Sequence, residues 1–176
     1  MIYPIRTENQ KDFEAVSVLI QNAFEHEEHS DHREHLLVER LRKSPSFVPG
    51  LSLVAEAESK IAGHILLTEI RIKNESAETL SLALAPVAVL QEYQGKGIGS
   101  ALITSAHQKA KELGYNSVVL LGHADYYPRF GYQQAHHFGI QLPFDVPLEN
   151  CMVIELVKGS LQGVSGMVEY PEEFYR

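Results

Sequence analysis

One stretch constrains the fold of this chain more than any other: an apolar run, a short polar link and a glycine-rich turn. The run is Ala85-Pro86-Val87-Ala88-Val89-Leu90, and the turn is Gln94-Gly95-Lys96-Gly97-Ile98-Gly99-Ser100. Glycines let a backbone approach an anion closely. A helix that begins at such a turn directs its first free N–H groups and the positive end of its dipole at the same place. The stretch therefore predicts a strand, a phosphate-binding turn and a helix.

Three kinds of phosphate site use glycines in this way, and residue spacing separates them. A mononucleotide P-loop needs Gly-x-x-x-x-Gly-Lys-Ser/Thr, whereas Lys96 is followed by Gly97. A dinucleotide fold needs Gly-x-Gly-x-x-Gly in a first strand–helix–strand unit, whereas Gly95 and Gly97 are followed by Gly99. A pyrophosphate site for coenzyme A has the form Gln/Arg-x-x-Gly-x-Gly/Ala, which Gln94, Gly97 and Gly99 match. The structural alternative is that the glycines only cap a helix.

The remaining pattern predicts a mixed α/β fold with a central, mostly antiparallel sheet of about seven strands and flanking helices. Apolar spacing favours a helix from Thr7 or Asn9 to Phe24, and another from Ser30 or Asp31 that stops at Ser44-Pro45. The expected strands are Ile2–Arg6, Leu51–Glu56, Ile61–Lys73, Thr79–Leu90, Ser117–Leu121, Phe138–Leu142 and Cys151–Val157, with Pro49-Gly50 as a loop.

Pro86 makes one of these strands irregular. It cannot donate a ladder hydrogen bond, so we expect the strand to bulge or splay at Pro86–Val89. The three strands from 51 to 90 form an antiparallel meander, and the helix after Ser100 leads to the strand at 117–121 by a parallel crossover. We expect one domain over residues 1–176, with 159–176 as an extended C-terminal arm.

Composition limits the partners. The 15 basic and 23 acidic residues give a formal net charge of −8, which argues against nucleic acid and anionic membranes as partners. No run is long enough to span a membrane, and Met1-Ile2-Tyr3-Pro4 does not open a signal peptide. The single cysteine, Cys151, excludes an internal disulfide and lies in an apolar run. We therefore expect a cytoplasmic protein with an inert buried thiol; the oligomeric state stays open.

The order of these features resembles the GCN5-related N-acetyltransferases (GNAT) across nearly the whole chain. The stretch Tyr126-Tyr127-Pro128-Arg129-Phe130-Gly131-Tyr132 is also similar to the family's Tyr-x-x-x-Gly-Phe ending, and to the Tyr-Tyr-x-Arg-Phe-Gly-Phe of a bacterial subgroup of predicted acetyltransferases. The resemblance implies an enzyme that moves the acetyl group of acetyl-CoA directly to a primary amine, without a metal. A non-catalytic acetyl-CoA-binding or sensing module on the same fold is the alternative, and a nucleotide-binding protein is a second one.

The resemblance also implies roles for individual residues. Backbone groups of Val87 and Ala88 would lie at the acetyl carbonyl and its oxyanion, and Val89 would lie against the pantetheine. Tyr127 would contact the coenzyme and act as the general acid, because a phenol with a pKa of about 10 is protonated at neutral pH. Tyr126 beside it is expected to be a packing aromatic. The pyrophosphate would lie on Gln94, Gly95, Lys96, Gly97, Ile98, Gly99 and Ser100.

The group that removes the proton of the amine is not defined by the sequence. The candidates, unranked, are Glu69, His64, Glu25, His26 and Glu28, and water alone is an equal alternative. The histidines His26, His29, His32 and His35 would share one side of a helix, and imidazoles at such spacing can bind metals. However, His26-Glu27-Glu28-His29 is one residue short of His-Glu-x-x-His, so a solvated wall of the acceptor groove is favoured.

Overall fold

The structure, a computed structural model, describes residues 3–176. These residues form two compact units. Unit 1 contains the chain up to Leu67 and Ala85–Lys109, and unit 2 contains Thr68–Leu84 and Ala110–Arg176. Strands β3 (Lys60–Lys73) and β4 (Glu78–Val89) contribute residues to both units.

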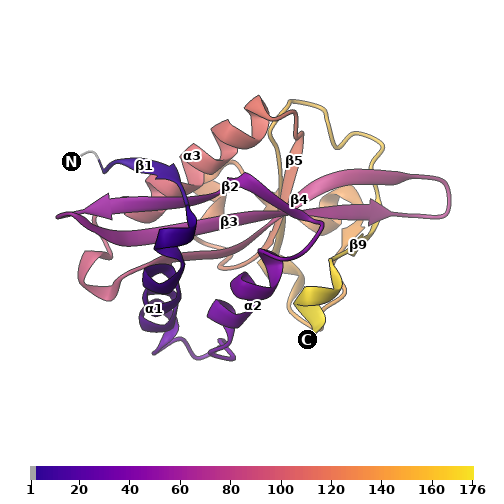
Figure 1. The fold of residues 1–176 in the computed structure, drawn as a ribbon. Coiled ribbons are helices and arrows are strands. Elements are labelled where there is room, and N and C mark those ends of the chain that lie inside the picture. The colour runs from indigo at the N-terminus through magenta and orange to yellow at the C-terminus, as the bar shows by residue number, and fades with distance from the viewer. Residues whose placement is uncertain (1–2) are drawn as a thin grey trace. The chain divides into compact units, whose positions relative to one another are not determined.

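The described residues contain three α-helices and nine strands of one sheet (Figure 1). Strand β4 pairs in parallel with β5, and β7 pairs in parallel with β9. The pairs β1 with β2, β3 with β9, β5 with β8 and β6 with β8 are antiparallel. The predicted mixed α/β fold with a mostly antiparallel sheet is thereby confirmed. The remaining elements are α1 (Phe13–Phe24), α2 (Glu34–Leu41), α3 (Ile98–Glu112), β1 (Ile5–Thr7), β2 (Phe47–Ala57), β5 (Ser117–Leu121), β6 (Gln133–Gln134), β7 (Ile140–Gln141), β8 (Cys151–Glu155) and β9 (Gly166–Glu169).

In unit 1, helices lie on both faces of the strands. Helices α1 and α2 lie side by side on one face, and α3 begins on the other (Figure 1). The apolar spacing that predicted the first two helices gives their buried side chains, which are Val16, Leu19 and Ile20 of α1 and Val38 and Leu41 of α2. On the opposite face, a Cβ at Gly63 would lie 2.8 Å from side-chain carbons of Ile98 and Leu102, so glycine permits the close approach of α3.

In unit 2, β5 is the apolar central strand that the sequence predicts. It pairs in parallel with β4, with Leu82 opposite Val118, and antiparallel with β8. Strand β9 continues the unit by pairing antiparallel with β3 and parallel with β7. The core between these strands contains Ile72, Val119, Val153 and Val168.

Several element boundaries differ from the sequence-based expectations. Pro49 and Gly50 are not a loop but lie inside β2; Pro49 is exposed near the start of this strand, where a missing N–H is tolerated. Helix α2 begins at Glu34, because Ser30 and Asp31 instead accept hydrogen bonds from the backbone of the turn that precedes it. It ends at Leu41.

Other differences concern the two termini and the last strands. The expected first strand begins at Ile2, which lies outside the described residues, and the observed one is Ile5–Thr7. The expected strand Phe138–Leu142 is a 3-10 turn at Ala135–Phe138 followed by the short β7. The tail after Gly159 contains β9, a strand that the sequence did not predict. No helix within residues 3–176 is both long enough and apolar enough to cross a membrane.

Candidate active site

The glycine turn lies in unit 1, between β4 and α3, and its backbone has the left-handed conformation that glycine permits. The φ angle is +77° at Gly95 and +86° at Gly97, and a Cβ at either position would meet no atom within 4 Å. Residues 94–97 are exposed. The side chain of Gln94 donates from Nε2 to the carbonyl oxygen of Val89 at 3.0 Å. The turn is therefore tied to the end of β4 and its backbone is open to a ligand.

Helix α3 presents unpaired backbone donors at this turn. In its first turn, the N–H of Ala101 donates to the carbonyl oxygen of Gly97 at 3.0 Å. The N–H groups of Ile98, Gly99 and Ser100 precede that bond and have no partner within the helix. The helix dipole and the nearby Lys96 ammonium, which lies 5.3 Å from the Tyr93 ring, add positive charge. This arrangement suits an anion such as a pyrophosphate.

The three residues expected at the acetyl group lie in the same unit, directly before this turn. Ala88 is buried, and Val87 and Val89 are half-buried at the end of β4. Strand β4 pairs with β5 at Leu82 and Ala83, both of which precede Pro86, a residue with no N–H to donate. The structure therefore brings Val87–Val89 together with the residues of the glycine turn.

Tyr127 lies in unit 2, where it begins a 3-10 helix that ends at Phe130. Its ring meets the ring of Tyr126 edge-on at 5.0 Å and that of Tyr132 at 5.8 Å. Burial raises the pKa of Tyr127 to about 12, and the neighbouring Tyr126 acts in the same direction. The phenol therefore carries its proton throughout the neutral range. Tyr126 packs against Arg129, whose Cζ lies 4.4 Å from the ring.

Two of the candidate bases are engaged by neighbouring side chains. His64 is completely buried, with Nε2 3.2 Å from Ser52 Oγ and 3.7 Å from Glu8 Oε2. Burial lowers the pKa of His64 to about 4 although Glu8 opposes the shift, so the ring is neutral at pH 7 and out of reach of an amine in solvent. Glu69, in unit 2, accepts a hydrogen bond of 2.6 Å from the hydroxyl of Tyr115.

A pocket of about 540 Å³ opens in unit 1 between the end of α1 and the start of α2. It is lined by Gln21, Asn22, Phe24, Glu25, His32 and Glu34. Glu25 is one of the candidate bases, whereas His26 and Glu28 are exposed in the neighbouring segment and do not line the pocket.

Two hydrogen bonds connect this pocket with the segment that leads into the glycine turn. The backbone N–H of Gln91 donates to Asn22 Oδ1 at 3.0 Å, and Gln91 Nε2 donates to the Asn22 carbonyl at 2.8 Å. Gln91 lies three residues before Gln94. The structure thus places an unpredicted pocket beside the predicted turn, and no pattern in the sequence marks Asn22 or Glu34 as part of it.

The histidine run does not form the row that helical spacing would produce. Residues 25–33 are not helical, so His26, His29 and His32 lie in a connecting segment and only His35 lies on α2. The backbone at His32 is left-handed, with φ at +59°, which breaks any helix across it. Within residues 3–176, no three His, Cys, Asp or Glu side chains form a group that could hold a metal ion.

Comparison with known proteins shows that the chain matches a protein family. The model of the acetyltransferase (GNAT) domain matches residues 4–135. The chain therefore belongs to the GNAT family of acetyltransferases, as the glycine turn and the tyrosine motif indicate.

Individual relatives extend the likeness over the full chain. The uncharacterized N-acetyltransferase YhbS of Escherichia coli K12 is 30% identical over 172 residues, which are 98% of each chain. The uncharacterized N-acetyltransferase YjhQ of the same organism is 37% identical to this chain over 135 residues, or 75% of each chain.

Two solved structures share the fold and carry a coenzyme. The structure of Escherichia coli YhbS in complex with CoA has a TM-score of 0.88 at 28% identity and covers 99% of this chain and 92% of that one. A GNAT family acetyltransferase from Brucella melitensis in complex with acetyl-CoA has a TM-score of 0.80 at 28% identity, with 98% of each chain covered.

Proposed function

We propose that this protein transfers the acetyl group of acetyl-CoA directly to a primary amine. The observation that carries the proposal is the open glycine turn at the start of α3, with two left-handed glycines and unpaired helical N–H groups. Family membership and the coenzymes held by the two similar structures support the same ligand for this chain.

The coenzyme half of the site consists of residues 87–100. The pyrophosphate binds the backbone of the turn from Gln94 to Ser100, and the pantetheine lies along Val89. Backbone N–H groups at Val87 and Ala88 stabilise the oxyanion that forms on the thioester carbonyl. One such rigid donor is worth about 3–4 kcal/mol of barrier.

The reaction is a direct attack on the thioester. The lone pair of the neutral amine forms a bond to the carbonyl carbon, and the carbonyl π electrons move to the oxygen. Collapse of this intermediate breaks the C–S bond, and Tyr127 donates its phenolic proton to the departing thiolate, which leaves as CoA thiol. The extra proton on the new amide nitrogen passes to water, and Tyr127 recovers a proton from solvent.

The acceptor half of the site is the pocket between α1 and α2. A primary amine is an ammonium ion at neutral pH, and Glu25 on the pocket wall attracts it. Its proton leaves to water or to this carboxylate before attack, since the lone pair must be free. We further infer a cytoplasmic location, because the thiol of Cys151 is free and buried.

Release of free thiol from acetyl-CoA tests the proposal directly. The acceptors are benzylamine, putrescine, a peptide with a free N-terminus, and an N-terminally blocked peptide that contains lysine. Thiol release with at least one of them, with the acetylated product seen by mass spectrometry, is the expected result. Binding of acetyl-CoA without thiol release on any acceptor would instead favour a sensing module. Thermal protection by ATP and not by acetyl-CoA would favour a nucleotide-binding protein.

A further inference from the structure

We propose that the buried ion pair between Glu8 and Arg42 is a positioning device, which holds the acceptor pocket in shape from the opposite end of the α1–α2 hairpin. The inference rests on the proposed function, because it takes the pocket between α1 and α2 as the amine site. Neither residue lines that pocket.

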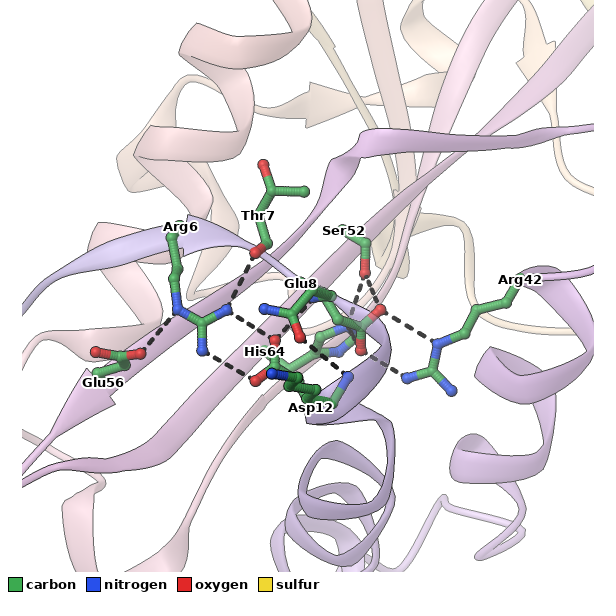
Figure 2. A network of polar contacts seen from close by, with 10 residues as sticks. Arg6, Thr7, Glu8, Asp12, Arg42, Ser52, Glu56 and His64 are labelled. Atoms are coloured by element: carbon green, nitrogen blue, oxygen red, sulfur yellow. Dashed lines mark hydrogen bonds and ion pairs between the residues drawn. The ribbon is translucent and has the colours of Figure 1, made fainter.

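The pair is held by several polar contacts at once (Figure 2). The Glu8 carboxylate accepts from Arg42 Nη2 at 2.6 Å, from Arg42 Nε at 3.2 Å and from Ser52 Oγ at 2.8 Å. The Glu8 side chain is 1% exposed and that of Arg42 is 11% exposed. Two parallel bonds from a planar guanidinium fix orientation as well as distance.

The ion pair lies at the base of the helical hairpin, and the pocket lies at its tip. Arg42 directly follows α2, and its guanidinium carbon lies 3.9 Å above the ring of Phe13, the first residue of α1. The pocket is lined by the last residues of α1 and by His32 and Glu34 at the start of α2. At 1.5 Å per residue, α2 spans about 12 Å from one end to the other.

The two helices are fastened differently at the tip. The end of α1 is bound to the segment before the glycine turn through the two Asn22–Gln91 hydrogen bonds. At the start of α2, the hydrogen bonds from Ser30 Oγ to Glu34 and from the Arg33 N–H to Asp31 are local. The base of α2 is bound differently, because Glu8 accepts hydrogen bonds from Arg42, directly after this helix, and from Ser52 of β2.

Apolar packing alone would define the orientation of α2 relative to α1 less well than packing and the ion pair together. The buried side chains of the two helices are aliphatic, and such side chains can repack with small shifts at modest cost. A buried ion pair cannot, because separating it leaves an uncompensated charge out of water. Since α2 is a single short helix, a tilt at Arg42 moves its first residue, Glu34, and with it the preceding segment that contains His32. The Glu8–Arg42 geometry thus sets the width of the acceptor pocket.

A matched control lies on β1, two residues before Glu8. Arg6 makes an equally forked pair with Asp12, at 2.7 and 2.9 Å, and also bonds Glu56 at 2.8 Å (Figure 2). This second pair joins β1, β2 and the start of α1 but involves no residue of α2. Arg6→Lys therefore removes a comparable fork of bonds without changing the attachment of α2.

The experiment compares Arg42→Lys, Glu8→Gln and Arg6→Lys with the unmodified full-length chain. Lysine keeps the charge but not the fork, and glutamine keeps the shape but not the charge. Hydrogen–deuterium exchange in the presence of CoA should become faster at residues 32–37 in the first two variants, with β2 and β3 unchanged. Arg6→Lys should lower Tm and leave exchange at 32–37 unchanged.

Kinetics on the four acceptors of the thiol-release panel provide the second readout. In Arg42→Lys and Glu8→Gln we expect KM for the acceptor to rise about tenfold, while KM for acetyl-CoA stays within about twofold of its original value. The double variant should be no worse than the more impaired single one, because both changes remove one link.

Either readout can overturn the inference. Unchanged exchange at 32–37, or an equal effect from Arg6→Lys, would mean that the pair only adds stability. Faster exchange with an unchanged acceptor KM would mean that the pocket does not depend on this link. If no acceptor is acetylated by the unmodified protein, the proposed function fails, and unequal exchange in Arg42→Lys and Arg6→Lys still decides whether the pair holds α2.

Discussion

The glycine turn and the acceptor pocket are neighbours in unit 1, joined by the Asn22–Gln91 hydrogen bonds, yet they are built from different parts of the chain. The turn binds a ligand through backbone groups, which come from two left-handed glycines and the first N–H groups of α3. The pocket offers side chains, from residues of two helices and the segment between them. A site made of backbone N–H groups keeps its preference for anions when neighbouring side chains are replaced. In a site lined by side chains, each substitution can change which ligand binds.

This difference separates the two binding steps of the proposed reaction. Changes in the turn should alter the affinity for acetyl-CoA, and changes in the pocket should alter the affinity for the amine. Tyr127 belongs to neither region, so its removal should alter the chemical step alone.

Replacing the general acid should give the largest kinetic loss. Tyr127→Phe keeps the packed ring but removes the proton donor, so kcat should fall about 100-fold, the lower range for a general acid, with both KM values almost unchanged. Steady-state thiol release measures this. Tyr126→Phe is the matched control, because Tyr126 packs against the same ring and we assign it no chemical role. An equal loss in both variants would contradict the assignment.

A side chain in the glycine turn should weaken coenzyme binding about tenfold. Gly97→Ala meets no steric clash, but left-handed backbone costs a residue other than glycine about 1–2 kcal/mol. The turn relaxes, its N–H groups turn away from the pyrophosphate, and KM for acetyl-CoA rises while KM for the amine does not.

Gly159→Ala is the control for this prediction. Gly159 has φ at +83° and equally open surroundings, but it lies outside the turn. It should show the same loss of Tm and no change in KM. An unaltered KM for acetyl-CoA in Gly97→Ala would remove the turn from the coenzyme site.

Neutralising a pocket carboxylate should have a smaller effect. Glu25→Gln should raise KM for the amine about threefold, as expected for a largely exposed charge that attracts an ammonium ion, and the effect should shrink at high salt. Glu39→Gln, an exposed site on α2 that does not line the pocket, should have none. If both variants behave alike, the pocket is not where the amine binds.

Removing the buried imidazole should leave kinetics unchanged and alter stability only. The pKa of His64 is about 4 in the folded chain against 6.5 for a free side chain. The unfolded chain therefore takes up this proton first, so stability is full above about pH 6.5 and falls as the pH drops towards 4.

In His64→Gln, the fall in Tm that His64 causes between about pH 6.5 and 4 should disappear. A second part should persist, because burial also lowers the pKa of His107 to about 4. The pH profile of kcat should be the same as in the unmodified protein. If kcat of His64→Gln depended on pH differently from kcat of the unmodified protein, His64 would take part in the reaction.

The sequence was informative where the backbone makes the site. The glycines from Gly95 to Gly99 predicted a turn whose backbone can approach an anion closely. The spacing of Gln94, Gly97 and Gly99 separated this turn from nucleotide-binding ones. The short polar links between strands likewise predicted the meander, and the order strand, helix, strand predicted the crossover to β5. Each of these signals is local and depends on one conformational property of the chain.

The pocket depends on contacts between distant residues and was not predictable in the same way. Asn22 lines it because Gln91, 69 positions later, binds its side chain and its carbonyl. Glu8 and Arg42 are 34 positions apart, and neither lies in a motif. The start of α2 was misplaced because Ser30 and Asp31 are good helix caps that here bind the backbone of the preceding turn instead.

The most direct test of the central claim is a calorimetric titration of the full chain with acetyl-CoA, repeated with ATP and with the variants Gly97→Ala and Gly159→Ala. We predict saturable binding of acetyl-CoA, no binding of ATP, an affinity about tenfold lower in Gly97→Ala and an unchanged affinity in Gly159→Ala. Binding of ATP but not of acetyl-CoA would contradict the account, as would equal affinities in the two glycine variants.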